Sequence, residues 1–167
     1  GMGYGVGGQK FLRAYLALAD GAPFQTLNPF VLNSEYPNET SILFQNDETA
    51  LCLLRRDEGS KTALLGRSRP PYRAWNWTDL GVRIGGPHMI RIPDGRIVAA
   101  VRLYDGKART SLCWLDPAEN TLTEFLALPS GGDTSYAGLG FRDGLLHVSY
   151  YSSHEARTAI YVAKVKL

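Results

Sequence analysis

Three positions at regular spacing carry side chains that could act on a bound ligand. Glu39, His88 and Tyr136 lie 49 and 48 residues apart, each where an apolar run begins. A carboxylate can act as a general base, and a phenol becomes a nucleophile when a neighbouring base takes its proton. Glu39 and Tyr136 are therefore the candidate catalytic pair.

A second set of polar side chains lies at the end of the following apolar runs and in the loops after them. Arginine forks match carboxylates in a bidentate way, so these positions predict contacts to a carbohydrate or a small anionic ligand. The candidate ligand-binding residues are Arg55, Arg56, His88, Arg102, Tyr150, His154 and Glu155. The two histidines lack the fixed spacing of a metal site, and neither a metal nor a cofactor is predicted.

Each of these assignments has a plainer interpretation. Glu39 could cap a turn or pair with an arginine, and Tyr136 could be a half-buried aromatic lining a channel. The arginines could be surface charges at strand ends. The sequence alone leaves both interpretations open.

An internal repeat indicates the fold that would bring these side chains together. Three similar segments have threonines at positions 62, 110 and 158, a spacing of 48 residues both times. Tight hairpin signals precede the second strand of each unit. They are Asn46-Asp47, Asp94-Gly95 and Asp143-Gly144. Four strands in every 40–50 residues are typical of β-propeller blades.

The repeat predicts an all-β chain holding about three four-stranded blades in a single partial propeller domain, residues 3–167. The expected units are strands within 10–32 that complete a blade, blades at 37–85 and 86–133, and a three-stranded blade at 134–167. Several strands are apolar on both sides, as in Ile97–Val101, which a sheet packed on both faces requires. A β-sandwich with coincidental spacing is the alternative. Gly1-Met2 is interpreted as a tag remnant.

Two segments resemble sialidases (neuraminidases). The run from Glu39 to Arg55, with its turn at 46–47, resembles the sialidase stretch that carries the glutamate base and ends in an arginine of the carboxylate-binding triad. Thr134–Leu139 resembles the segment that holds the nucleophilic tyrosine. Further runs at 68–72, 75–80 and 150–155 are similar to sialidase-like hydrolases. The resemblance implies a six-bladed propeller, with Glu39 as base and Tyr136 as nucleophile.

Half of a six-bladed ring would leave apolar sheet faces exposed, which monomers rarely tolerate. We therefore expect a homodimer that closes the ring, with the N-terminal strands completing the partner's last blade; a truncated piece of a longer propeller is the alternative. The net charge of +2 is spread along the chain, so neither nucleic acid nor a membrane surface is a favoured partner. The sequence does not predict a compartment.

The leading functional hypothesis is a sialidase-like glycoside hydrolase homologue that acts on an unknown acidic or neutral sugar. A non-catalytic carbohydrate-binding or assembly propeller is the first alternative. A truncated gene fragment without activity of its own is the second. A second carboxylic acid within reach of Glu39 or Tyr136 would distinguish hydrolysis from binding, because glycosidases pair two such groups.

Overall fold

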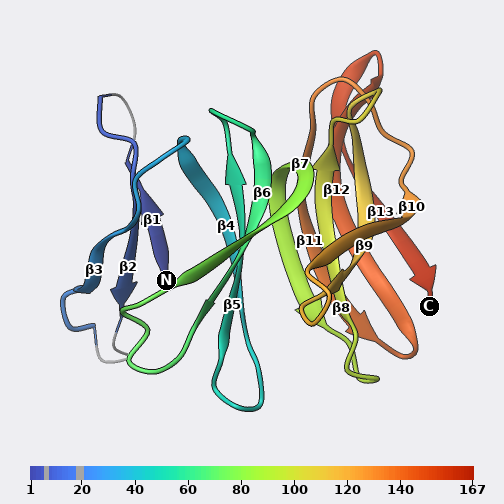
Figure 1. Ribbon diagram of the computed structural model, residues 1–167. Helices are drawn as coiled ribbons and strands as arrows, with labels where there is room; N and C mark the ends of the chain where they lie inside the picture. The colour runs from blue at the N-terminus through green and yellow to red at the C-terminus, as the bar shows by residue number, and fades with distance from the viewer. Residues whose placement is uncertain (6–7, 18–20) are drawn as a thin grey trace.

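The computed structural model describes residues 1–5, 8–17 and 21–167, and the regular elements of these residues are all strands (Figure 1). They form a three-stranded sheet, a seven-stranded sheet and a second three-stranded sheet. The strands are β1 (Met2–Tyr4), β2 (Leu12–Leu16), β3 (Gln25–Leu32), β4 (Pro37–Phe44), β5 (Ala50–Arg56), β6 (Thr62–Ser68), β7 (Asn76–Arg91), β8 (Ile97–Leu103), β9 (Arg109–Asp116), β10 (Thr121–Ala127), β11 (Thr134–Arg142), β12 (Leu145–Glu155) and β13 (Arg157–Lys166). No helix able to cross a membrane occurs among these described residues.

The seven-stranded sheet joins two blades through one long strand. Its order is β10-β9-β8-β7-β6-β5-β4, and all neighbouring strands are antiparallel. The first half of β7 pairs with β6, and its second half pairs with β8. The sequence predicted that one blade ends at residue 85 and that the next begins at residue 86. The structure instead has the single strand β7 here, with a bulge between Gly85 and His88, so the outer strand of one blade continues as the inner strand of the next.

The N-terminal sheet differs from the sequence prediction. Met2 belongs to β1, which pairs with β2, and its side chain packs against Leu12, Leu54 and Leu64. Met2 is therefore part of the fold. Part of the strand expected over Lys10–Ala19 lies outside the described residues, and β2 covers the described part from Leu12 onward.

The core consists of layers between successive blades. On β8, Ala99 and Val101 face the cluster shared with the β4–β7 blade, whereas Val98 and Ala100 face the cluster shared with β11–β13. All four side chains are buried. Successive residues of a strand point to opposite faces, so an uninterrupted apolar run fits a sheet that is covered on both sides. This is how propeller blades stack.

Each inner strand carries a β-bulge at the same place. The pairing register shifts between Pro37 and Thr40 on β4, between Gly85 and His88 on β7, and between Ser135 and Gly138 on β11. A bulge turns a side chain or amide away from the regular alternation, and bulges are common beside active sites. The three bulges place the candidate site at one end of the inner strands.

Candidate functional site

The carboxylate of Glu39 lies where the three bulges meet. Its Oε2 accepts hydrogen bonds from Nη1 of Arg55 at 2.9 Å and from the backbone N–H of Gly86 at 2.8 Å. Its Oε1 accepts a hydrogen bond from the hydroxyl of Tyr136. Glu39 comes from β4, Gly86 from β7 and Tyr136 from β11, so a single carboxylate joins all three inner strands.

Two further side chains fix this cluster from behind. Asp57 accepts a hydrogen bond from Nε of Arg55 at 3.0 Å and one from Nδ2 of Asn38 at 2.8 Å. The Oδ1 of Asn38 accepts the backbone N–H of Glu39 at 2.7 Å. The Arg55 guanidinium is thus held between two carboxylates, which aims it at Glu39. The sequence reasoning missed Asn38, although an Asn beside a bulge is a residue that bonds to its own backbone.

Glu39 is held in its ionised form. Burial opposes its ionisation, but the hydrogen bonds from Tyr136, Arg55 and Gly86, together with the charge of Arg55, outweigh that effect. The pKa of Glu39 therefore lies below its ordinary value. Near neutral pH the group is an acceptor and a weak base.

Tyr136 shows the complementary shift. Its hydrogen bond to Glu39, followed by burial and the negative charge of Glu39, raises the pKa of Tyr136 to about 12. The phenol is therefore protonated near neutral pH and donates to Glu39. The structure brings the predicted base and nucleophile together, but proton transfer from the phenol to this carboxylate is uphill. The arrangement suits binding better than attack by a phenolate.

An aromatic surface borders the cluster. Tyr136 is 58% exposed and stacks on Tyr151, with ring centroids 6.1 Å apart. Arg102 donates to the hydroxyl of Tyr151 at 3.2 Å and forms an ion pair with Asp133 at 3.3 Å. The Tyr151 hydroxyl also donates to Asp133 at 2.7 Å. Arg102 thus supports the tyrosine pair, and Asp133, which the sequence reasoning missed, is its carboxylate partner.

A small pocket of about 280 Å³ opens beside these groups. It is lined by Met2, Tyr4, Glu39, Thr40, Gly86, Pro87 and Tyr136. Larger pockets occur at the other end of the strands, away from the Glu39 cluster. No group of three or more potential metal-ligating side chains is found in the described part of the chain.

Arg56 and Tyr150 point elsewhere. Arg56 is buried and forms ion pairs with Glu35 and with Asp79, so its charge is already satisfied within the fold. Because neighbouring residues of a strand face opposite sides, Arg55 and Arg56 cannot both reach the site. Tyr150 is 4% exposed and donates its hydroxyl to the carbonyl of Pro129 at 2.8 Å. It belongs to the core.

The remaining predicted residues take local contacts. Nδ1 of His88 lies 2.9 Å from the carbonyl oxygen of Ala137, a contact between β7 and β11. His154 packs against the ring of Tyr161 at 4.7 Å, and Glu155 accepts the Tyr161 hydroxyl at 2.9 Å. The structure does not bring these three side chains into hydrogen bonding with the Glu39 cluster.

No family model and no curated protein matches the chain. Solved structures do match. A Dyadobacter fermentans protein of unknown function aligns over 94% of this chain and 46% of its own, at 18% identity and a TM-score of 0.82. A Bacteroides ovatus protein described as xyloglucan PUL GH43B aligns over 93% and 34%, at 12% identity and a TM-score of 0.69. An endo-1,4-beta-xylanase from Bacteroides thetaiotaomicron aligns over 98% and 64%, at 9% identity and a TM-score of 0.69.

These neighbours overturn the sialidase assignment. Those with a named activity are glycoside hydrolases of the five-bladed GH43 type and related xylanase folds, not sialidases. The predictions of sialidase membership and of a six-bladed sialidase ring are therefore wrong. The resemblance rested on strand–turn–strand patterns, which propeller blades repeat generally. The chain spans less than two thirds of each structure named above, and at these identities the likeness shows the fold alone, a β-propeller architecture shared with glycoside hydrolases.

Proposed function

We propose that this chain is the sugar-binding part of a glycoside-hydrolase-type propeller and that the Glu39 cluster contacts a neutral, β-linked oligosaccharide. The observation that carries the proposal is an ionised carboxylate, fixed by donors from β5, β7 and β11, beside an aromatic ring that is 58% exposed. The neighbours named for xyloglucan and for xylanase activity favour this ligand class.

The chemistry of the site fits a sugar. A carboxylate accepts hydrogen bonds from sugar hydroxyls, and the bonds that it already accepts fix its orientation before a ligand arrives. The exposed face of Tyr136 offers an apolar surface for the C–H face of a sugar ring. Stacking on Tyr151 holds that surface in place. A few fixed polar groups around an apolar surface are typical of small-molecule sites.

Hydrolysis is the second candidate, and Asp133 is the observation that favours it. Glycosidases pair two carboxyl groups about 5–10 Å apart. Asp133 accepts the hydroxyl of Tyr151, whose ring stacks on Tyr136, so it borders the same aromatic surface as Glu39. If the chain hydrolyses glycosides, Asp133→Asn and Glu39→Gln should each abolish release of nitrophenol from an aryl β-xyloside. If the wild type binds the sugar but releases no nitrophenol, and the variants lose binding, then binding is the function.

Calorimetric titration with xylotetraose tests the binding proposal. Tyr136→Ala removes the aromatic surface and should weaken binding about tenfold, whereas Tyr136→Phe keeps the ring and should stay within about threefold. Phe44→Ala is the matched control, since Phe44 is a 57% exposed aromatic at the other end of β4. The proposal fails if Tyr136→Ala binds as tightly as the wild type, or if Phe44→Ala weakens binding equally.

A further inference from the structure

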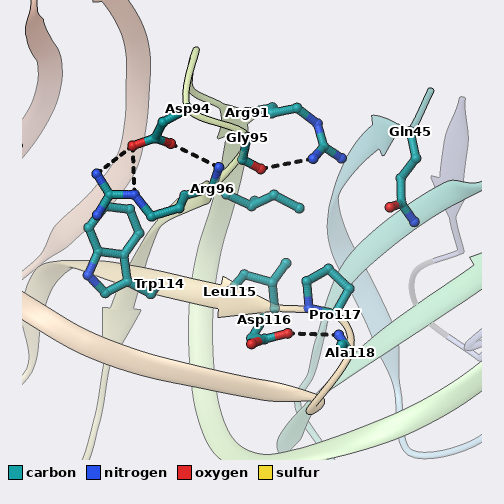
Figure 2. A pocket seen from close by; sticks show the side chains of 11 residues that line it. Gln45, Arg91, Asp94, Gly95, Arg96, Trp114, Leu115, Asp116, Pro117 and Ala118 are labelled. Carbon is teal, nitrogen blue, oxygen red and sulfur yellow. Dashed lines mark hydrogen bonds and ion pairs between the residues drawn. The ribbon is translucent and has the colours of Figure 1, made fainter.

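A second groove lies at the opposite end of the strands from Glu39. Its first part is a pocket of about 580 Å³ between the β4–β5 turn, the β7–β8 turn and the β9–β10 turn. Figure 2 shows Arg91 and Gln45 on one side of this pocket and Leu115, Asp116 and Pro117 on the other. The pocket is formed by two complete four-stranded blades.

An adjoining pocket of about 670 Å³ extends the groove along the β6–β7 loop. The two pockets share Gln45. Arg67 lines the second pocket and reaches the first, because its guanidinium donates to the carbonyl of Pro117 and to Oδ1 of Asn120. We call the combined feature the hairpin groove. It is defined by Gln45, Arg67, Arg73, Arg91, Trp114 and Pro117.

The hairpin groove carries positive charge that the fold does not neutralise. Arg67 donates only to uncharged oxygens, and Nη1 of Arg91 donates to the carbonyl of Gly95 at 2.9 Å. Nη2 of Arg91 is buried and has no hydrogen-bond partner. Within residues 1–5, 8–17 and 21–167, the side chains of Arg67, Arg73 and Arg91 form no ion pair. Buried donors without a partner are rare, and an anion would supply one.

The acidic residues of the groove leave this excess in place. Asp94 pairs with Arg96, and Oδ1 of Asp116 accepts the backbone N–H groups of Ala118 and Glu119. Asp94 is thus neutralised by Arg96, whereas Asp116 keeps its charge and offsets one positive charge of the groove. Against this one charge stand Arg67, Arg73 and Arg91, so the groove keeps a net positive charge.

The walls between the charges are apolar. The guanidinium of Arg96 lies over the ring of Trp114, 4.2 Å from its centroid (Figure 2). Trp114 also stacks on Phe125, with ring centroids 4.4 Å apart. Pro117 continues this surface along the pocket. A ligand that fits must present carboxylates at intervals along a body with apolar faces. A sugar chain with uronic acid residues has this chemistry, whereas a bare phosphate has no apolar face.

We propose that the hairpin groove binds an acidic oligosaccharide, with Arg91 and Arg73 as the carboxylate contacts. Guanidinium forks match carboxylates in a bidentate way. The site is independent of the Glu39 cluster, since Glu39 and Gln45 stand at opposite ends of β4, roughly 20 Å apart at the usual rise of a strand. A chain of this kind would hold a neutral sugar at one end of its strands and an acidic chain at the other.

Titration of the wild type with trigalacturonate in low and high salt tests this proposal. We expect binding that weakens severalfold as the salt rises, because the contacts are ionic. Arg91→Gln and Arg73→Gln should each weaken it about tenfold. The Arg73 variant changes an exposed side chain, so it keeps the test valid if Arg91→Gln fails to fold. Arg157→Gln, an exposed arginine at the start of β13, is the matched control and should change nothing.

Three outcomes would overturn the proposal. Neutral galactotriose could bind as tightly as trigalacturonate, or both groove variants could bind like the wild type. Inorganic phosphate or a short single-stranded oligonucleotide could bind at least as tightly as trigalacturonate, which would mark a general anion site. Failure of this test is separate from failure at the Glu39 cluster, because Tyr136→Ala should leave trigalacturonate binding unchanged.

Discussion

At the level of single residues, Glu39 is defined by its donors. A half-buried carboxylate without partners would have a raised pKa. Here three donors reverse that effect, and one of them, Arg55, is itself fixed by Asp57. The same hydrogen bond raises the pKa of Tyr136, so the proton shared by the pair stays on the phenol. Glu39 is therefore preorganised as an acceptor.

This arrangement predicts a pH-dependent contribution to stability. Because the pKa of Glu39 is lower in the folded chain, its contribution is complete above the unfolded value of about 4.3 and is lost as the pH falls through the folded value. Glu39→Gln should lower the free energy of unfolding by about 1–2 kcal/mol at pH 7, and this difference should shrink toward zero at low pH. Urea denaturation from pH 7 to pH 2.5 measures it.

Glu119→Gln is the control for that series. Glu119 is an exposed turn residue, and its contact to Oδ1 of Asp116 is made by its backbone N–H, which the substitution keeps. Its stability should match the wild type at every pH. A gap between Glu39→Gln and the wild type that stays constant down to pH 2.5 would contradict the proposed ionised state of Glu39.

At the level of elements, the bulges determine which groups reach the site. Gly86 and Tyr136 occupy equivalent bulge positions on β7 and β11, and their φ angles are +50° and +49°. This left-handed conformation turns the Gly86 amide and the Tyr136 side chain toward Glu39. A β-carbon on Gly86 would lie 2.0 Å from Oγ of Ser135 and 2.9 Å from the backbone nitrogen of Tyr136. Only glycine allows the two strands to approach so closely.

Gly86→Ala should therefore lower the free energy of unfolding by about 3 kcal/mol, through both backbone strain and the clash with Ser135. Gly81→Ala is the matched control: its φ is +68°, but a β-carbon there meets open space. The free energy of unfolding of that variant should fall by only about 1 kcal/mol, from the strain of a positive φ alone. Guanidinium denaturation of both variants separates the two contributions. Equal losses would show that the close approach at Gly86 contributes nothing.

The sequence allowed the strands to be predicted but not the bulges. Hairpin turns such as Asp94-Gly95 and Asp143-Gly144 are local signals, so the strands beside them were located closely. A bulge depends on how two strands pair, and no residue type predicts it. Arg55 and Arg56 show how this limits the prediction of site residues. Both were candidates, yet strand alternation sends one to Glu39 and the other to Glu35 and Asp79.

At the level of the whole molecule, each blade is stabilised by the next. Three buried clusters fill the spaces between successive blades and between the N-terminal sheet and the first blade, and each draws side chains from both sides. The β11–β13 sheet uses one face this way. On β13, Tyr161, Ala163 and Val165 face the cluster shared with β8 and β9. The opposite face, with Ile160 and Val162, has no sheet against it in the described part of the chain.

That open face predicts self-association of the isolated chain. Ile160 is 74% exposed and Val162 is 70% exposed, and they lie on β13, which pairs only with β12 among the described strands. An unpaired edge strand with exposed aliphatic residues pairs readily with another chain. Light scattering should therefore give a mass above 18.4 kDa for the wild type.

Ile160→Lys with Val162→Lys should return it to a monomer, because charges on an edge strand oppose pairing. Lys164→Ile, on the same face, should increase association. A wild type that stays monomeric at high concentration would mean that the open face is tolerated in solution, and the expected homodimer would then be excluded.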